Sequence, residues 1–200
     1  MGLNYTLDRN NTYKEGAEQL PVDVAYVCKI IGAKEVNYTT ASGFNVHRLD
    51  IALDVAEGEY AGYYQQRFDA DTSEDKKWKG VVKLNIPKGD GSEQDGWTIK
   101  SFNTSLCNIE DSNPGYTWDN NLEHLKGKKI GLVLRSKEYE FNGNRGFYSE
   151  PYKLITVKNA QEQKFRKPAT KYLSNNSSSP VAPADGFVPI PEGADEEIPF

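Results

Sequence analysis

Hydrophobic and polar residues alternate along several stretches of the chain, and this period of two predicts β-strands. A first strand is expected over residues 22–31 and a second over residues 44–55, with a turn-rich loop at residues 37–43 between them. Residues 57–79 are mostly polar, so we interpret them as a long loop. Alternating Val82, Leu84 and Ile86 then predict a third strand that ends before Pro87.

The second strand is typical of a half-buried sheet strand. Its apolar residues lie in one phase, and Arg48, Asp50 and Asp54 lie in the other. We therefore expect these three charged side chains on the exposed face of the sheet.

The period changes after the third strand. Ile99, Phe102, Leu106 and Ile109 recur at spacings of three and four, which predicts an amphipathic helix buried along this stripe. A short helix is expected near residues 120–125. Alternation returns over residues 129–139 and 147–157, and the Asn- and Gly-rich segment 142–146 predicts a hairpin between these two strands.

A helix between the third and fourth of five strands is the chain order of the OB fold. The sequence thus predicts a mainly β chain with one or two helices, in a five-stranded Greek-key OB barrel; other five-stranded α+β barrels share this order. The predicted divisions are an N-terminal arm at residues 1–20, the OB domain at 21–170, and a disordered linker with a C-terminal tip at 171–200. The linker is rich in Ser, Asn and Pro and poor in large apolar residues.

Length and charge narrow the possibilities further. The 200 residues correspond to one domain and a tail, without an apolar run long enough to span a membrane and without a signal-peptide core, which predicts a cytoplasmic protein. Cys28 and Cys107 are expected to be free, buried thiols. The net charge is −5, and residues 174–200 contain five acidic residues and no basic one, so the net negative charge of the chain lies in the tail.

The last six residues are the most informative motif. Three acidic residues precede Ile-Pro-Phe, so that Phe200 carries an aromatic ring and a carboxylate at the same position. This combination is suited to an apolar pocket rimmed by basic residues on a partner protein. The predicted partner-binding residues are Asp195, Glu196, Glu197, Ile198, Pro199 and Phe200.

This acidic Ile-Pro-Phe ending, behind a Pro- and Ser-rich linker and a predicted OB barrel, resembles the C-terminal tip of bacterial and phage single-stranded DNA-binding proteins. The body is most similar to the divergent forms that phages and mobile elements carry. The resemblance implies a protein that binds and protects single-stranded DNA (ssDNA) without sequence specificity. It also implies recruitment of replication, repair or recombination enzymes through the tip, and leaves homo-oligomerisation open.

Such a protein needs aromatic rings that stack on bases and cations that pair with phosphates. In OB folds the second and third strands and the adjoining loops form the binding groove. Trp78 is the strongest stacking candidate, because an indole between lysines has little evident packing role. The predicted DNA-binding residues are Tyr38, Phe44, Arg48, Lys76, Lys77, Trp78, Lys79, Lys83, Arg145, Phe147 and Tyr148.

No pattern in the chain favours catalysis. His47 and His124 are the only histidines, and neither has a Cys or His partner at metal-ligand spacing. We therefore predict no enzymatic activity, cofactor or metal. Two alternatives stay open: a small-barrel adaptor that binds proteins or RNA, and a metal-dependent nuclease whose acidic residues meet only in the fold.

Overall fold

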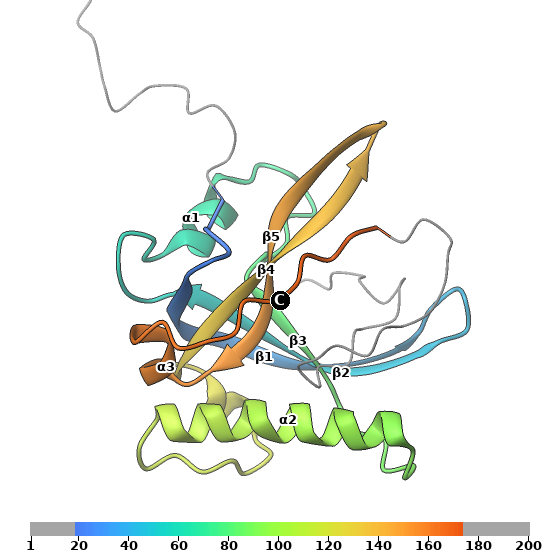
Figure 1. The fold of residues 1–200 in the computed structure, drawn as a ribbon, viewed down its shortest axis with the longest axis vertical. Helices are drawn as coiled ribbons and strands as arrows, with labels where there is room; N and C mark the ends of the chain where they lie inside the picture. Colours follow the sequence, from blue (N-terminus) through green and yellow to red (C-terminus); the bar gives the residue numbers. More distant parts are fainter. Residues whose placement is uncertain (1–18, 174–200) are drawn as a thin grey trace, which may run out of the picture.

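The computed structural model describes residues 19–173, and this part of the chain is mainly β (Figure 1). The strands are β1 (Ala25–Thr39), β2 (Asn45–Val55), β3 (Val81–Asn85), β4 (Lys129–Phe141) and β5 (Asn144–Ile155). The helices are α1 (Tyr63–Ala70), α2 (Glu93–Ser112), the 3-10 helix η1 (Leu122–Leu125) and α3 (Val157–Gln161).

The five strands form one antiparallel sheet in the order β3-β2-β1-β4-β5. With α2 between β3 and β4, this is the strand order of an OB fold. The sheet curls until its edge strands β3 and β5 contact each other, but within residues 19–173 they share no hydrogen-bonded ladder. The prediction of a mainly β, OB-like fold is confirmed, and the barrel is open between β3 and β5.

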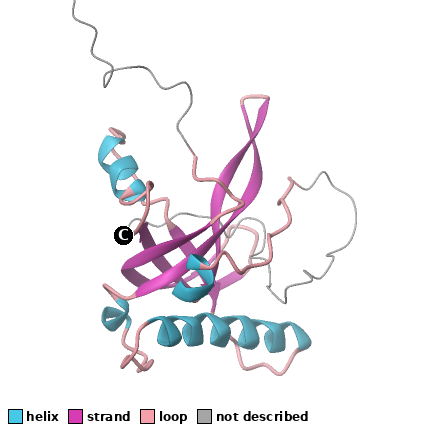
Figure 2. Ribbon diagram, turned by 60° about the vertical axis from the view of Figure 1, so that its left-hand side comes forward, coloured by secondary structure: helices cyan, strands magenta, loops and turns pink. Residues whose placement is uncertain are grey.

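The inner face of the sheet carries the main hydrophobic core. Leu49, Ile51 and Leu53 of β2 pack there against residues from every other strand. Helix α2 lies across one end of this sheet, as Figures 1 and 2 show. It buries Leu106 and Ile109 and packs Phe102 against the core, but Ile99 is 38% exposed, so the expected apolar stripe begins at Phe102 rather than at Ile99.

Several element bounds differ from the sequence-based expectation. β1 extends to Thr39 and takes up the start of the predicted loop at residues 37–43, because residues Glu35–Thr39 pair with β2. The predicted loop at 57–79 contains α1, and a short helix, α3, follows β5. α3 covers a second, smaller cluster of buried residues on the outer side of the sheet, where Val27 meets Val133 and Ala160.

Strands β4 and β5 continue past the sheet as a projecting hairpin, seen best in Figure 2. Both edges of this hairpin are covered. The Lys171 amide donates to Ser136 O at 2.9 Å and Glu138 N donates to Lys171 O at 2.8 Å, while Gln19 Nε2 donates to Phe147 O at 3.2 Å. Such edge pairing blocks unwanted strand addition.

These contacts shift the expected divisions of the chain. Leu20, assigned to the arm, is buried in the core, and Lys171, assigned to the linker, pairs with β4. Cys28 is buried as expected, but Cys107 is exposed on α2. Of the helices in residues 19–173, none is long and apolar enough to cross a membrane.

Candidate nucleic-acid interface

The candidate interface lies on the outer face of the sheet, which is opposite the main core. On β2 this face carries Arg48, Asp50 and Asp54, as the alternation predicts, because the intervening residues point into the core. Cross-strand pairing places Lys34 of β1 and Lys83 of β3 on either side of Asp50.

Arg48 and Asp50 form a buried ion pair. The guanidinium Nε donates to Asp50 Oδ1 at 2.7 Å and an Nη donates to Oδ2 at 3.2 Å. Arg48 is 0% exposed and Asp50 is 2% exposed, so the expectation that the two lie on an exposed face is wrong. A planar guanidinium can satisfy a carboxylate with two parallel hydrogen bonds, which makes burial of both charges tolerable.

We call Asp50, the cations around it and the nearby tyrosine the first wing of the interface. Its members are Lys34, Tyr38, Arg48, Asp50 and Lys83. The Arg48 guanidinium lies 5.9 Å from the centre of the Tyr38 ring. Three cations accompany a single carboxylate here, with Arg48 bonded to it and Lys34 and Lys83 on the neighbouring strands, so the wing is net positive beside an aromatic ring. Paired cations and rings are what a nucleic-acid strand requires for its phosphates and bases.

The projecting hairpin carries a second wing, which also combines cations, tyrosine rings and one carboxylate. Its members are Arg135, Lys137, Tyr148, Glu150 and Tyr152. Arg135 Nε donates to Glu150 Oε2 at 2.9 Å, and Lys137 Nζ donates to Oε1 at 3.1 Å. The Arg135 guanidinium lies 4.5 Å from the centre of the Tyr152 ring, and Lys137 Nζ lies 5.7 Å from that of Tyr148. Two cations again share one carboxylate.

The structure gives Trp78 a packing role that sequence reasoning missed. Its indole Nε1 donates to Leu53 O at 2.9 Å, and its ring lies 5.6 Å from that of Phe68. Lys76 Nζ lies 4.5 Å from the centre of the same Phe68 ring. Leu53 is near the end of β2, so Lys76, Lys77, Trp78 and Lys79 lie toward the end of the sheet away from the β1–β2 turn.

The remaining predicted residues divide between several surfaces. Phe44, in the β1–β2 turn, is 54% exposed. Tyr148 is paired with Lys137 and belongs to the second wing. Its neighbour Phe147 lies on the opposite face of the hairpin, where the centre of its ring is 6.0 Å from the centre of the Tyr172 ring. Arg145 Nε donates to Glu140 Oε2 at 2.8 Å. The structure therefore gathers Tyr38, Arg48 and Lys83 on one wing and Tyr148 on the other.

Four basic or aromatic members of the wings were absent from the sequence-based candidates: Lys34, Arg135, Lys137 and Tyr152. A signal was present for two of them, because Arg135, Lys137 and Tyr139 alternate along β4 in the phase opposite to its apolar residues. The six predicted partner-binding residues, 195–200, lie outside the described residues.

No family model matches the chain, and no curated protein is significantly similar to it. The interpretation of this surface therefore depends on its own topology and chemistry.

Proposed function

We propose that this protein binds single-stranded DNA without sequence specificity across the outer face of its open OB-like sheet, and that it has no catalytic role. The observation that carries the proposal is the pair of wings, in which lysine and arginine side chains lie beside tyrosine rings, one ring on β1–β3 and two on β4–β5. Unpaired bases expose their faces for stacking on such rings, whereas a duplex does not.

The strand order supports the same function. In OB folds the outer surface of the second and third strands, with the loops that flank it, is the usual place for an oligonucleotide. Lys83 on β3 and Lys34 on β1 lie on this surface. Stacking contributes about 1 to 3 kcal/mol per base, so a few rings and cations are sufficient for strong binding.

We further propose that the C-terminal tip, residues 195–200, recruits replication, repair or recombination enzymes. Its acidic residues attract a basic surface, and the Phe200 ring with its terminal carboxylate provides the anchor. This division of labour separates DNA binding from partner binding within one chain.

The test is the affinity of the double variant Lys83→Gln/Lys137→Gln, one substitution on each wing, for labelled oligothymidylate. The slope of log affinity against log salt concentration should become shallower by about 1 to 1.5, at roughly 0.7 for each phosphate that the variant no longer binds. The control is Lys100→Gln/Lys164→Gln, since Lys100 lies on Trp97 of α2 and Lys164 pairs with Glu162. Equal slopes for both double variants would contradict the proposal.

The alternatives give different results in the same assay. An adaptor for RNA or proteins should show no preference for a DNA strand over duplex or over RNA. A metal-dependent nuclease should shorten the labelled DNA strand when Mg²⁺ is added. Intact DNA, bound in preference to duplex and RNA, is the result we expect.

A further inference from the structure

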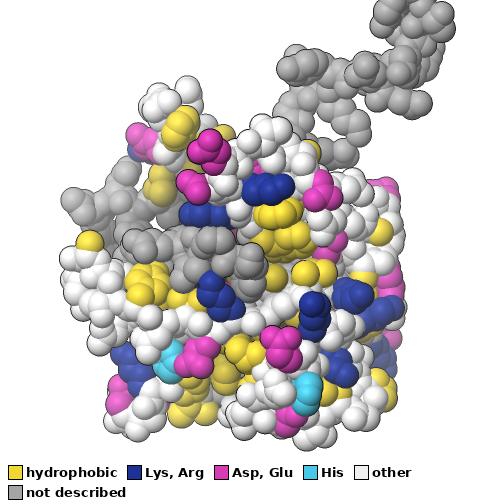
Figure 3. Space-filling model, turned by 180° about the vertical axis from the view of Figure 1, so that it is seen from behind, with side chains coloured by type: hydrophobic (Ala, Val, Ile, Leu, Met, Phe, Trp, Pro, Cys, Tyr) yellow, Lys and Arg dark blue, Asp and Glu magenta, His cyan; other side chains and the backbone are white. Residues whose placement is uncertain are grey.

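A second basic surface lies at the other end of the sheet, away from the β1–β2 turn. Lys126 and Lys128 lie in the turn between η1 and β4, and Lys129 is the first residue of β4. Lys29 of β1 is directly opposite Lys129. We call these four residues the lysine turn. Figure 3, which views the molecule from behind, shows Lys and Arg side chains gathered on the side that carries α3 and the C-terminal end of α2.

The lysine turn brings four like charges together. Lys29 and Lys129 are a cross-strand pair on one face of the β1–β4 ladder, and like charges directly opposite each other destabilise a sheet. Lys29 also faces Asp54 across the β1–β2 ladder, and Lys128 Nζ lies 4.6 Å from the centre of the Tyr116 ring. Within residues 19–173, Lys129 is the one member that forms an ion pair, with Glu57 Oε1 at 2.8 Å. The hydrogen bond from Lys129 lowers the pKa of Glu57. The surface thus keeps a net positive charge that an anion would relieve.

The backbone of the turn is held rigidly in place. Gly127 N donates to Ile30 O and Ile30 N donates to Lys128 O, both at 2.8 Å. The Asn113 side chain links the C-terminal end of α2 to the start of β4. Its Oδ1 accepts from Lys129 N at 2.9 Å, and its Nδ2 donates to Lys129 O at 2.8 Å. Preorganisation of this kind reduces the entropy lost when a ligand binds.

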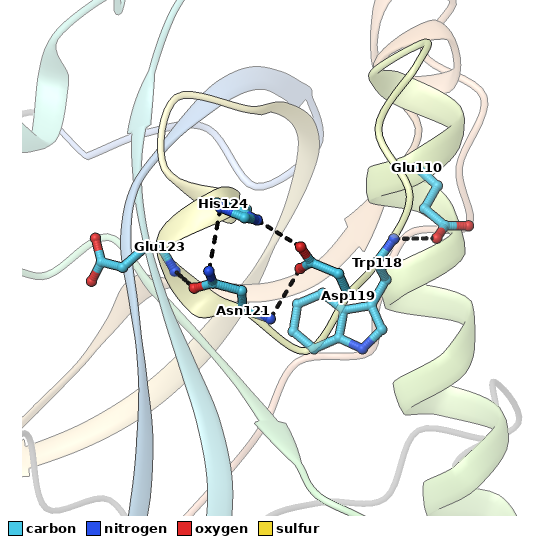
Figure 4. A network of polar contacts seen from close by, with 6 residues as sticks. All are labelled: Glu110, Trp118, Asp119, Asn121, Glu123 and His124. Carbon is cyan, nitrogen blue, oxygen red and sulfur yellow. Dashed lines mark hydrogen bonds and ion pairs between the residues drawn. The ribbon is translucent and has the colours of Figure 1, made fainter.

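The loop before the turn is also ordered by side chains, as Figure 4 shows. Trp118 N donates to Glu110 Oε1 at 2.6 Å, and His124 Nδ1 lies 2.6 Å from Asp119 Oδ2. Asn121 Oδ1 accepts from Glu123 N and so caps η1. These contacts fix the position of η1, which ends at Leu125, next to the first lysine of the turn.

Strand β1 connects this surface to the first wing. Lys29, Lys34 and Tyr38 all lie on the outer face, because their partners Asp54, Asp50 and Val46 share one phase of β2. Lys29 and Lys34 are separated by about 17 Å of strand at a rise of roughly 3.3 Å per residue. At Gly32, between them, no heavy atom of residues 19–173 lies within 4 Å of the position that a Cβ would take, so these residues do not obstruct the path along β1 there.

We propose that the lysine turn is a second contact site for the phosphates of a DNA strand that leaves the first wing along β1. The inference rests on the proposed function and extends it, because this turn lies beside Lys29 and Ile30 in the first half of β1, away from the β1–β2 loop that flanks the first wing. The turn engages only DNA strands long enough to reach it. Strand length is therefore the variable that distinguishes it from the wings.

The experiment compares wild type with Lys29→Gln/Lys126→Gln on labelled oligothymidylates of about 6 and about 20 nucleotides. The first length is near the lower end, and the second beyond the upper end, of the roughly 4 to 16 nucleotides that one OB domain occupies. With the long DNA strand, the variant should bind several-fold more weakly at low salt, with a salt slope shallower by about 1 to 1.5. With the short DNA strand, variant and wild type should be equal. Lys100→Gln/Lys164→Gln is the matched control.

A second variant should act in the opposite direction. Glu57→Gln removes the carboxylate that neutralises Lys129, and should strengthen binding of the long DNA strand while steepening its salt slope by about 0.7. Binding of the short DNA strand should not change.

The outcomes separate this inference from the proposed function. One outcome is that wild type binds both lengths while the lysine-turn variant loses affinity for neither, or loses it equally for both. Either result would refute the lysine turn as a second contact site and leave the proposed binding at the wings intact. If wild type binds neither length, the proposed function and the inference fall together.

Discussion

At the scale of single residues, the indole hydrogen bond of Trp78 decides what this side chain does. The ring is half-buried against the core and against Phe68, and its N–H is directed at Leu53 O rather than at solvent. A base stacked on Trp78 would need a free ring face. The wings place the rings of Tyr38 and Tyr148 beside cations, 5.9 Å from the Arg48 guanidinium and 5.7 Å from Lys137 Nζ.

We therefore predict that Trp78→Phe lowers stability but leaves ssDNA affinity unchanged. The substitution keeps a ring in the packing site and removes one hydrogen bond, which should lower the free energy of unfolding by about 1 kcal/mol or more. Urea denaturation and oligothymidylate anisotropy measure the two effects. A variant that keeps its stability and loses affinity would show that Trp78 stacks on bases.

Residue patterns predict which side chains share one face of a strand, but not what each side chain contacts. The alternation in β2 placed Arg48 and Asp50 on the outer face correctly, yet both side chains are buried there and hydrogen-bonded to each other. Likewise, the lysines flanking Trp78 are near in sequence, while its partner Leu53 is 25 residues away. Contacts across strands depend on register, which the sequence pattern alone does not specify.

At the scale of elements, the strands and α2 were predictable because each has a sustained period. Helix α1 was missed although Tyr60, Tyr64 and Phe68 recur every four residues, because no capping residue marks its start: Gly62 precedes it in the left-handed region at φ 74°. The open edge between β3 and β5 was also unpredictable, since closure of a barrel depends on strand length and tilt. β3 has only five residues.

The junction between β2 and β3 depends on a close approach at Gly80. Leu53 N donates to Gly80 O at 2.7 Å, and a Cβ at position 80 would lie 2.4 Å from Leu53 O and 2.6 Å from the Tyr64 ring. Backbone and a buried ring cannot move aside easily. Gly80 is therefore needed for β3 to reach its partner strand.

We predict that Gly80→Ala lowers the free energy of unfolding by about 1 to 3 kcal/mol, the usual effect of overpacking. The control is Gly32→Ala, because no heavy atom of the described part of the chain lies within 4 Å of a Cβ there. That variant should be as stable as wild type, or more stable by about 0.4 to 1 kcal/mol through loss of unfolded-state entropy. Thermal denaturation of the two variants side by side is the measurement. Equal stabilities would mean that β3 does not depend on this approach.

At the scale of the whole molecule, charge is divided between the body and the tail. Residues 174–200 carry five acidic residues and no basic one, while the described body carries the two wings and the lysine turn. An acidic segment tethered to a basic surface competes electrostatically with a nucleic acid for that surface. Such competition weakens as salt screens the charges.

Deletion of residues 185–200 should therefore raise affinity for oligothymidylate at low salt, and the difference from wild type should shrink as salt increases. Phe200→Ala, which keeps all the acidic residues, is the control and should bind DNA as wild type does. Anisotropy at matched salt concentrations tests both variants. Unchanged or weaker binding by the truncated protein would contradict competition by the tail.

The central claim is that the outer face of the sheet binds a single DNA strand through phosphate contacts and stacking. The most direct measurement is the anisotropy of end-labelled oligothymidylate titrated with the full-length protein at several salt concentrations, with duplex DNA of the same length as competitor. A label on the DNA is preferable to tryptophan fluorescence, because none of the three tryptophans belongs to a wing. We predict saturable binding that duplex displaces poorly and that weakens with salt by a slope of about −0.7 per phosphate contacted. Absence of binding at low salt, or equal competition by duplex, would contradict the account.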